Sequence, residues 1–232
     1  GDIYQICKTF RDEEQGSRHN PEFTMLEYYR LGFNLKTLMD EVAQLVGDYL
    51  NIQNRNDFEY QNAMLRFAKV DPFMASDSEL RAMLTQYVGE DLELSRDECL
   101  DLIMSYLVEP NLPKNSLVLI YHYPASQAAL AKTSQDYQGN NIAKRFELYV
   151  NGLELANGYD ELTDVSEQKK RFESEKQKNS SNDTPQDELF LKALEAGLPE
   201  CSGVALGLDR ILMLKQTAKK ISDVLAFTFS NA

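Results

Sequence analysis

Tryptophan is absent from this chain of 232 residues, and histidine and cysteine are scarce. The three cysteines, Cys7, Cys99 and Cys201, are too few and too scattered for a disulfide framework, and their odd number suits a reducing compartment. We therefore expect a cytoplasmic protein. Because His19 and His122 are the only histidines, the sequence offers no credible Ser-His-Asp arrangement for nucleophilic catalysis.

Long apolar runs and an excess of basic charge are also missing. No apolar stretch approaches the roughly 20 residues that a membrane span needs, so we expect no membrane partner. The 37 acidic and 24 basic residues give a net charge of −13, and an acidic surface repels phosphate backbones. Tight binding of nucleic acid by this chain alone, tRNA included, is therefore not expected. The remaining composition is that of an ordinary soluble globular protein.

Two β-hairpins are predicted from the pattern of apolar residues and turns. Residues 3–10 and 23–33 read as paired strands, joined by a loop of about twelve residues. Loops of that length in a compact domain are typically functional or mobile. The stretches "KRFELYVNG" and "LELANGY", residues 144–152 and 153–159, read as the second hairpin, because an Asn-Gly pair is the strongest short hairpin signal.

Helical periodicity is clearest at residues 35–50, where apolar side chains recur at spacings of three and four. Residues 61–109 are expected to hold two or three further amphipathic helices, and residues 164–178 a charged helix. Residues 117–121 read as a short buried strand, and residues 201–214 as a glycine-bearing strand that runs into a helix. Antiparallel hairpins with helices between them predict an α+β fold.

Three acidic residues of the second hairpin and the segment after it, Glu147, Glu154 and Glu161, follow one another at intervals of seven. Carboxylates on adjacent antiparallel strands lie close together, and a cation relieves their repulsion. Hard oxygen ligands indicate Mg²⁺, which typically bridges one or two carboxylates to substrate phosphates. The alternative is that these glutamates face solvent, as most glutamates on strands do.

The stretch "SGVALGLDR", residues 202–210, also has two interpretations. Glycine inside a strand usually marks a bulge or the close approach of another group, but Gly203 and Gly207 equally permit tight packing of a helix. Arg210 at the entry to a helix meets unfavourable dipole charge unless it faces an anion. The stretch matches neither GxGxxG nor a P-loop.

Three long motifs resemble those of the class II aminoacyl-tRNA synthetases, in the same order. The stretch "FRDEEQGSRHNPEFTMLEYY" resembles their second motif, "GVALGLDRILML" their third, and "RFELYVNGLELANGYDELTD" the segment between these two motifs in the lysyl enzymes. The resemblance implies a class II synthetase-like antiparallel sheet flanked by helices, with residues 1–232 as a catalytic domain. The first motif of the family, which builds its dimer interface, is not recognised, so we expect a missing N-terminal part and a homodimer when the protein is intact.

Within that superfamily the chain is most similar to the GenX/PoxA group, the lysyl-synthetase paralogues that ligate β-lysine to elongation factor P. The stretch "YHYPASQAALAK", residues 121–132, replaces an acidic version in lysyl-tRNA synthetases. Thr163 stands where those synthetases have asparagine, and Ala205 where they have a second glycine. An added methyl group at Ala205 narrows the expected amino-acid pocket, which discriminates by about 1–3 kcal/mol. The alternatives are the catalytic core of a lysyl-tRNA synthetase and a non-catalytic binding paralogue.

The resemblance implies roles for individual residues, with ATP and Mg²⁺ as cofactors, elongation factor P as protein substrate, and β-lysine or lysine as amino acid. The catalytic residues would be Arg11 and Arg210. The ATP site would comprise Arg11, Asp12, Glu13, Asn20, Phe23, Glu154, Leu155, Gly207 and Arg210. The amino-acid site would comprise Tyr29, Asn157, Glu161 and Ala205, and the Mg²⁺ ligands would be Glu147 and Glu154. Asp12 departs from the family pattern, which commonly has asparagine there.

Overall fold

The computed structural model describes residues 1–12, 15–89, 93–178 and 187–229. Within these ranges the strands are β1 (Ile3–Phe10), β2 (Glu22–Leu31), β3 (Arg55–Glu59), β4 (Leu117–Pro124), β5 (Thr133–Gln135), β6 (Asn141–Val150), β7 (Leu153–Asp160) and β8 (Cys201–Gly207). They form one sheet in the order β1-β2-β8-β7-β6-β4-β3, with β5 paired to β6 outside that path. β3 and β4 run parallel, and the other neighbours are antiparallel.

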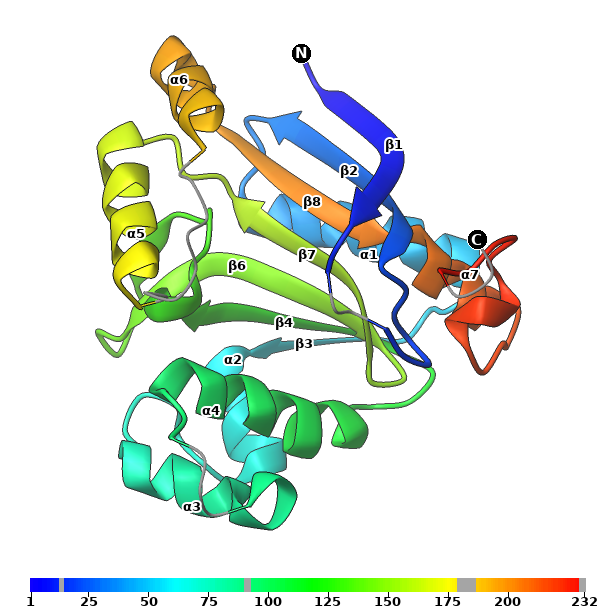
Figure 1. The fold of residues 1–232 in the computed structure, drawn as a ribbon, viewed down its shortest axis with the longest axis horizontal. Coiled ribbons are helices and arrows are strands. Elements are labelled where there is room, and N and C mark those ends of the chain that lie inside the picture. The colour runs from blue at the N-terminus through cyan, green and yellow to red at the C-terminus, as the bar shows by residue number, and fades with distance from the viewer. Residues whose placement is uncertain (13–14, 90–92, 179–186, 230–232) are drawn as a thin grey trace.

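Helices flank this sheet, so the predicted α+β fold is confirmed (Figure 1). The α-helices of the described chain are α1 (Leu35–Leu50), α2 (Tyr60–Ala63), α3 (Asp77–Val88), α4 (Arg96–Ile103), α5 (Val165–Lys178), α6 (Glu188–Gly197) and α7 (Leu208–Lys215). Short π-helical turns continue α2 and α4 at residues Met64–Ala68 and Met104–Val108. None of the helices in the described part of the chain has the length and hydrophobicity that a membrane crossing requires.

Both predicted hairpins are present. β1 and β2 pair with Ile3 opposite Tyr29, and β2 ends at Leu31, shortly before the predicted end at residue 33. In the second hairpin Asn151 and Gly152 have φ angles of +55° and +76°, the left-handed conformation that a tight two-residue turn requires.

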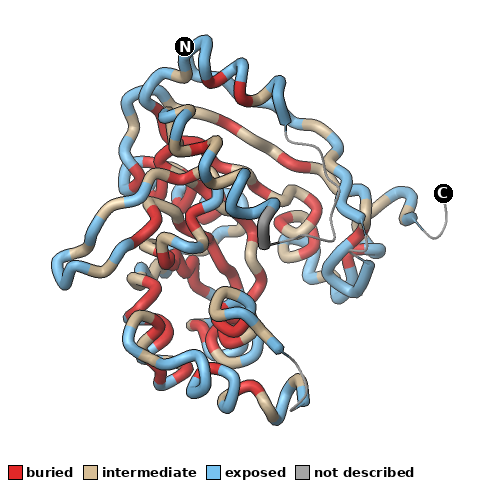
Figure 2. The backbone as a smooth tube through the Cα atoms, turned by 60° about the vertical axis from the view of Figure 1, so that its left-hand side comes forward, coloured by how far each residue is buried: buried red, intermediate tan, exposed pale blue. Residues whose placement is uncertain are grey.

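The two faces of the sheet are covered differently. One face packs against α1 and α7, and Leu38, Phe146 and Leu206 are among the residues buried there. On the other face α2, α3 and α4 cover the part of the sheet formed by β3, β4 and β6, through a second core that includes Leu100 and Ile120. Buried residues gather in the middle of the molecule, with exposed ones around them (Figure 2). The uncovered part of the second face, formed by β2, β8 and β7, carries the candidate site.

Candidate active site

A β-bulge in β7 decides where the clustered glutamates point. In the ladder between β6 and β7, Glu154 and Ala156 pair with successive residues of β6, which leaves Leu155 as an extra residue. Glu154 and Glu161 are separated by an odd number of positions, so in a regular strand they would point to opposite faces. The bulge shifts the alternation by one residue. Both carboxylates therefore lie on the face opposite α1.

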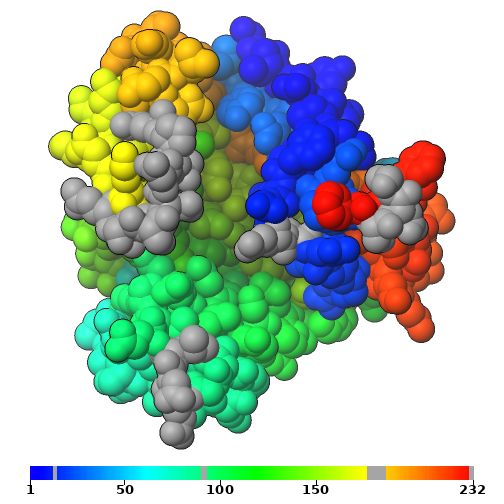
Figure 3. All heavy atoms as spheres, in the orientation of Figure 1, coloured from blue at the N-terminus to red at the C-terminus, as the bar shows by residue number. Residues whose placement is uncertain are grey.

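A first cavity of about 100 Å³ lies between the segment that joins β1 to β2, strand β7 and the start of α7. Figure 3 shows this face of the molecule hollowed between the N-terminal strands, helix α5 and the α3–α4 region. Arg18 and His19 belong to the lining. Seven of the residues predicted for the ATP site also line this cavity: Arg11, Asn20, Phe23, Glu154, Leu155, Gly207 and Arg210.

Positive charge is concentrated at this cavity although the chain is strongly acidic. Nη1 of Arg210 donates to the backbone carbonyl of Glu154 at 3.0 Å and lies 3.6 Å from its Oε2. The Arg11 guanidinium lies 5.3 Å from the centre of the Phe23 ring. Together with Arg18, these side chains place three guanidinium groups around one cavity, an arrangement that attracts phosphate groups.

A second cavity of about 130 Å³ adjoins the first. All four residues predicted for the amino-acid site line it: Tyr29, Asn157, Glu161 and Ala205. Asn157 and Ala205 line the first cavity as well, so the two cavities share a wall. The structure thus brings seven of the nine predicted ATP-site residues and all four predicted amino-acid residues into two adjoining compartments.

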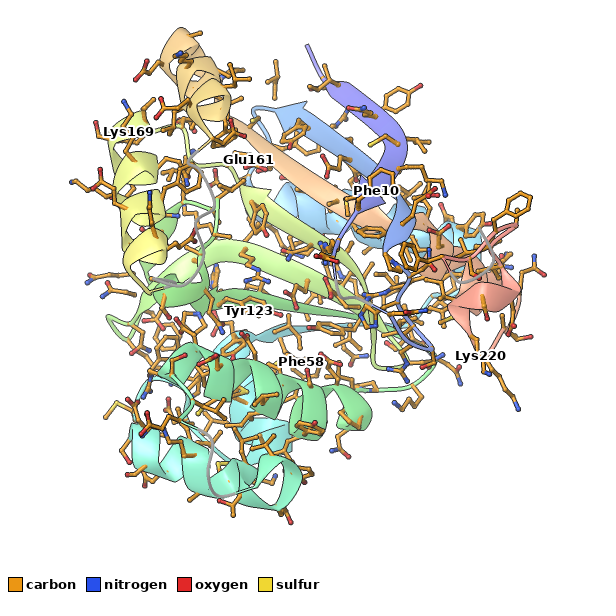
Figure 4. The ribbon with its side chains drawn as sticks, in the orientation of Figure 1. Phe10, Phe58, Tyr123, Glu161, Lys169 and Lys220 are labelled. Atoms are coloured by element: carbon orange, nitrogen blue, oxygen red, sulfur yellow. The ribbon has the colours of Figure 1, made fainter. Side chains whose placement is uncertain are left out.

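Gly203 leaves room for two side chains that line the second cavity, those of Tyr29 and Glu161. A Cβ atom at this position would lie 2.6 Å from ring carbons of Tyr29 and closer still to Oε1 of Glu161. Figure 4 shows Glu161 just beyond the end of β7, at the side of the sheet where α5 and α6 lie. Of the two interpretations of the glycines, the close approach of another group is therefore correct for Gly203.

The second cavity is acidic, because the carboxyl groups of Glu27 and Glu161 line it. Burial, followed by the charges of Asp160 and Glu27, raises the pKa of Glu161 to about 8, and Lys132 opposes this shift. Burial and the neighbouring Glu161 raise the pKa of Tyr29 to about 12. A cation that enters the cavity would favour the ionised carboxylate of Glu161. The site is therefore suited to a ligand that carries an ammonium group.

Glu147, predicted as a metal ligand, lines neither cavity. Its buried carboxylate accepts hydrogen bonds from the hydroxyl of Tyr123 at 2.6 Å, from the hydroxyl of Tyr149 and from the guanidinium of Arg145. The amide of Asn157 lies 3.5 Å away. These donors occupy the lone pairs that a metal ion would need.

Of the two predicted Mg²⁺ ligands, Glu154 is the one whose side chain lines a cavity. Burial and the charge of Glu147 raise the pKa of Glu154 to about 7, while Arg210 opposes the shift. No group of three or more His, Cys, Asp or Glu side chains converges on a metal position in the described ranges. Because Mg²⁺ usually takes only one or two carboxylates along with phosphate oxygens and water, Glu154 fits such an ion. Glu147 can bind the ion only if one of its present hydrogen-bond donors moves away from the carboxylate.

Two predicted ATP-site residues are not placed in the cavity. Asp12 is exposed and lies outside the lining of both cavities, and Glu13 lies outside the described residues. Asn20 is buried, and its amide is already engaged: Nδ2 donates to the carbonyl of Glu22 at 2.6 Å, and Oδ1 accepts from the amide of Phe229 at 3.2 Å. Asn20 thus ties the segment between the first two strands to the C-terminal part of the chain.

Sequence reasoning missed several residues in or beside the two cavities, among them Arg145, Leu130 and Tyr159. Arg145 lies two positions before Glu147 on β6, so strand alternation places both on one face, and its Nε donates to Oδ1 of Asn157 at 3.2 Å. Strand alternation could therefore have predicted that Arg145 lies beside Glu147. Leu130 and Tyr159 line the second cavity. For Leu130 the sequence contains no such signal, because it lies in an irregular segment.

The sequence profile of the family described as "tRNA synthetases class II (D, K and N)" matches residues 1–231. The chain belongs to this family of class II tRNA synthetases. Its sheet and its pair of adjoining cavities are the framework on which the predicted motif residues come together.

Within this family the chain is similar to proteins named elongation factor P–(R)-beta-lysine ligase. The relatives from Salmonella typhi and Edwardsiella ictaluri are each 45% identical to it, and that from Pectobacterium carotovorum subsp. carotovorum is 43% identical. Each alignment covers 100% of this chain and 73% of the relative. The resemblance to the GenX/PoxA group is therefore confirmed.

Proposed function

We propose that residues 1–232 form the catalytic domain of an ATP-dependent ligase that activates (R)-β-lysine as an adenylate and transfers it to a lysine side chain of elongation factor P. The names of the relatives support this reaction and its two substrates. The observation that carries the proposal is the wall shared by the two cavities, formed by Asn157 and Ala205. An aminoacyl adenylate joins a nucleotide to an amino acid, so its site needs two adjoining compartments.

The nucleotide occupies the first cavity in this proposal. Arg11 binds the α-phosphate and the amino-acid carboxylate, Arg210 binds the γ-phosphate, and Phe23 stacks on adenine. The guanidinium groups suit these roles because their planar donors form paired hydrogen bonds with anionic oxygens. Leu155 and Gly207 form the adjoining wall, where a missing side chain at residue 207 leaves space for a bound group.

The amino acid occupies the second cavity. Glu161 in its ionised form pairs with the side-chain ammonium group, and Tyr29 and Asn157 complete the contact. The buried acidic group of Glu161 in this cavity supports a basic amino acid over an apolar one. The methyl group of Ala205 lies on the wall towards the nucleotide, where it narrows the passage between the compartments.

The chemistry has two steps and needs no covalent bond to the protein. A carboxylate oxygen of the amino acid attacks the α-phosphorus of ATP, the bond to the bridging oxygen breaks, and pyrophosphate leaves. Arg11 and Arg210 hold the reacting groups in line and neutralise the charge that develops on phosphate oxygens. The neutral amine of the acceptor lysine then attacks the carbonyl carbon, AMP leaves, and the amine loses a proton as the amide forms.

Mg²⁺ is part of the proposal, with Glu154 as direct ligand and Glu147 as the second acidic residue. The ion supplies neutralisation of phosphate charge when it is bound. The carboxylate of Glu154 lines the arginine-lined cavity, and a cation there would offset both the burial and the charge of Glu147 that raise the pKa of Glu154.

A second copy of the chain is the proposed partner of the β1 edge. Strand β1 ends the sheet, yet Ile3, Tyr4, Ile6 and Phe10 are each more than half exposed. A groove of about 470 Å³ runs between β1, β2 and α1 beside them. Exposed apolar edge strands usually pair with another chain or are covered by one, which favours a homodimer.

The test of the function is an exchange and transfer assay. Exchange of labelled pyrophosphate into ATP is measured with α-lysine and with (R)-β-lysine, followed by transfer to elongation factor P or to tRNA. We expect exchange with (R)-β-lysine and transfer to the protein. Efficient charging of tRNA would instead make the chain a lysyl-tRNA synthetase core, and a lack of exchange with every amino acid would favour a non-catalytic binding protein.

A further inference from the structure

The segment 128–132 supplies one wall of the second cavity from outside the sheet. Leu130 lines the cavity, whereas the other lining residues belong to β2, β7 and β8 or directly follow β7. The segment has no regular secondary structure of its own, and Ala129 has a φ angle of +47°, which non-glycine residues seldom adopt. Contacts with neighbouring elements must therefore hold Leu130 in place.

Hydrogen bonds to successive carbonyl groups provide these contacts. The amide of Leu162 donates to the carbonyl of Leu130 at 2.8 Å, and that of Ala131 donates to the carbonyl of Ala128 at 2.8 Å. The carbonyl groups of Ala129 and Ala131, on either side of Leu130, have a different donor. Both accept from Nη1 of Arg171, at 2.9 and 2.7 Å.

Arg171 reaches the segment from α5 and is held there. Its Nε lies 3.1 Å from Oε1 of Glu167, one helical turn earlier, and only 16% of its side chain is exposed. Nη1 carries two N–H groups, one for each carbonyl, so a single nitrogen fixes the backbone on both sides of Leu130. Arg171 itself lines neither cavity.

We propose that Arg171 is a positioning residue that fixes Leu130 as a wall of the amino-acid cavity and so contributes to the affinity for lysine isomers and the selection between them. This inference rests on the proposed function of the second cavity. A charged donor to two carbonyl groups forms stronger hydrogen bonds than a neutral one, which suits a backbone that has to stay in an uncommon conformation.

The kinetic test compares Arg171→Met with Lys169→Met in pyrophosphate exchange. Lys169 lies on the same helix (Figure 4) and forms an exposed ion pair with Glu195 at 2.6 Å, so its variant is a matched control. We expect Arg171→Met to raise the KM for (R)-β-lysine by about tenfold or more, since small misplacements of a site are costly. The KM for ATP should stay within about twofold of the unaltered protein, and the preference between the two lysine isomers should fall.

Two further variants separate positioning from a general loss of structure. Arg171→Lys keeps a charged donor and should restore part of the lysine affinity. In a Leu130→Ala background, Arg171→Met should add little to the loss, because the side chain that it positions is already gone. Equal increases in the KM for ATP and for lysine, or additive effects of the two substitutions, would overturn the inference.

A measurement independent of activity keeps the inference distinct from the proposed function. Hydrogen–deuterium exchange of the segment 128–132 and of the Leu162 amide should be faster in Arg171→Met and unchanged in Lys169→Met. Unchanged exchange in both variants would show that Arg171 does not hold the segment. If the unaltered protein activates no lysine isomer but this exchange difference appears, Arg171 holds the segment as inferred, whereas the proposed function is wrong.

Discussion

The raised pKa of Glu161 makes amino-acid binding dependent on pH in a defined direction. The carboxyl group ordinarily has a pKa of 4.5, and burial and the charges of Asp160 and Glu27 raise it to about 8. Below pH 8 the free protein therefore holds this group mainly protonated. In the proposed site a lysine ammonium binds the ionised form, so each ligand that binds below pH 8 should displace a proton from Glu161.

The size of the effect follows from the fraction of Glu161 that is ionised. With a pKa of about 8, roughly 1% of the groups are ionised at pH 6 and roughly half at pH 8. The apparent affinity for lysine should therefore rise by roughly fiftyfold between these two pH values. Tyr29 contributes no change, because its pKa of about 12 lies above the range.

The assay is calorimetric titration of the amino acid into nucleotide-free protein between pH 6 and pH 9, in two buffers of different ionisation enthalpy. The buffers report the protons released, which should approach one per ligand at pH 6 and fall above pH 8. Glu161→Gln provides the control: its weaker binding should not vary with pH through this group. An affinity that is constant from pH 6 to pH 8, or an equal slope in the variant, would refute the reasoning.

Three further predictions concern the same two cavities. Glu161→Gln should stabilise the protein by about 2–5 kcal/mol at pH 9 and little at pH 5. Between pH 4.5 and about pH 8 the folded state retains a proton on Glu161 that the unfolded chain loses, and the resulting loss of stability is complete above pH 8; thermal unfolding at both pH values checks this, and an equal effect at both would contradict it. Arg11→Ala should lower the rate of pyrophosphate exchange by a factor of about 10²–10³. The circular dichroism spectrum should stay unchanged, since Arg11 is exposed. Retained exchange would show that Arg11 does not have the proposed role. Gly203→Ala should weaken lysine binding by about tenfold or more, because the new Cβ would overlap with Glu161 and Tyr29. Gly207→Ala is the control and should leave lysine binding unchanged, since its new Cβ would lie 3.9 Å from its nearest neighbour. Equal binding by the two variants would contradict this prediction.

Local features of the fold could be predicted from the sequence because local physics determines them. Asn151 and Gly152 form the predicted turn since both adopt positive φ angles. The helix at residues 35–50 has the predicted bounds, and Asn34 caps it by accepting a hydrogen bond from the amide of Thr37. Its apolar stripe is less uniform than expected, because Leu45 and Tyr49 are about half exposed.

The order of the strands could not be predicted in the same way. Strand β8 lies between β2 and β7, although more than 150 residues separate it from β2 along the chain. The parallel pair of β3 and β4 likewise joins segments with a helical region between them. Such pairings depend on long-range packing, which periodicity and turn signals do not contain.

The spacing of Glu154 and Glu161 does not by itself predict that their carboxylates share one face of the sheet. An interval of seven between Glu154 and Glu161 contradicts strand alternation, and taken alone it favours carboxylates on opposite faces. The extra residue Leu155 resolves the contradiction, because it lets the strand bury both Leu155 and Ala156 against α1 while the two carboxylates share the open face. The bulge therefore lets β7 and the residue after it place a carboxylate at each end of the proposed adenylate, Glu154 beside the phosphates and Glu161 beside the ammonium group. A variant that deletes Leu155 would restore regular alternation and turn one of these carboxylates into the core, where no cation could reach it.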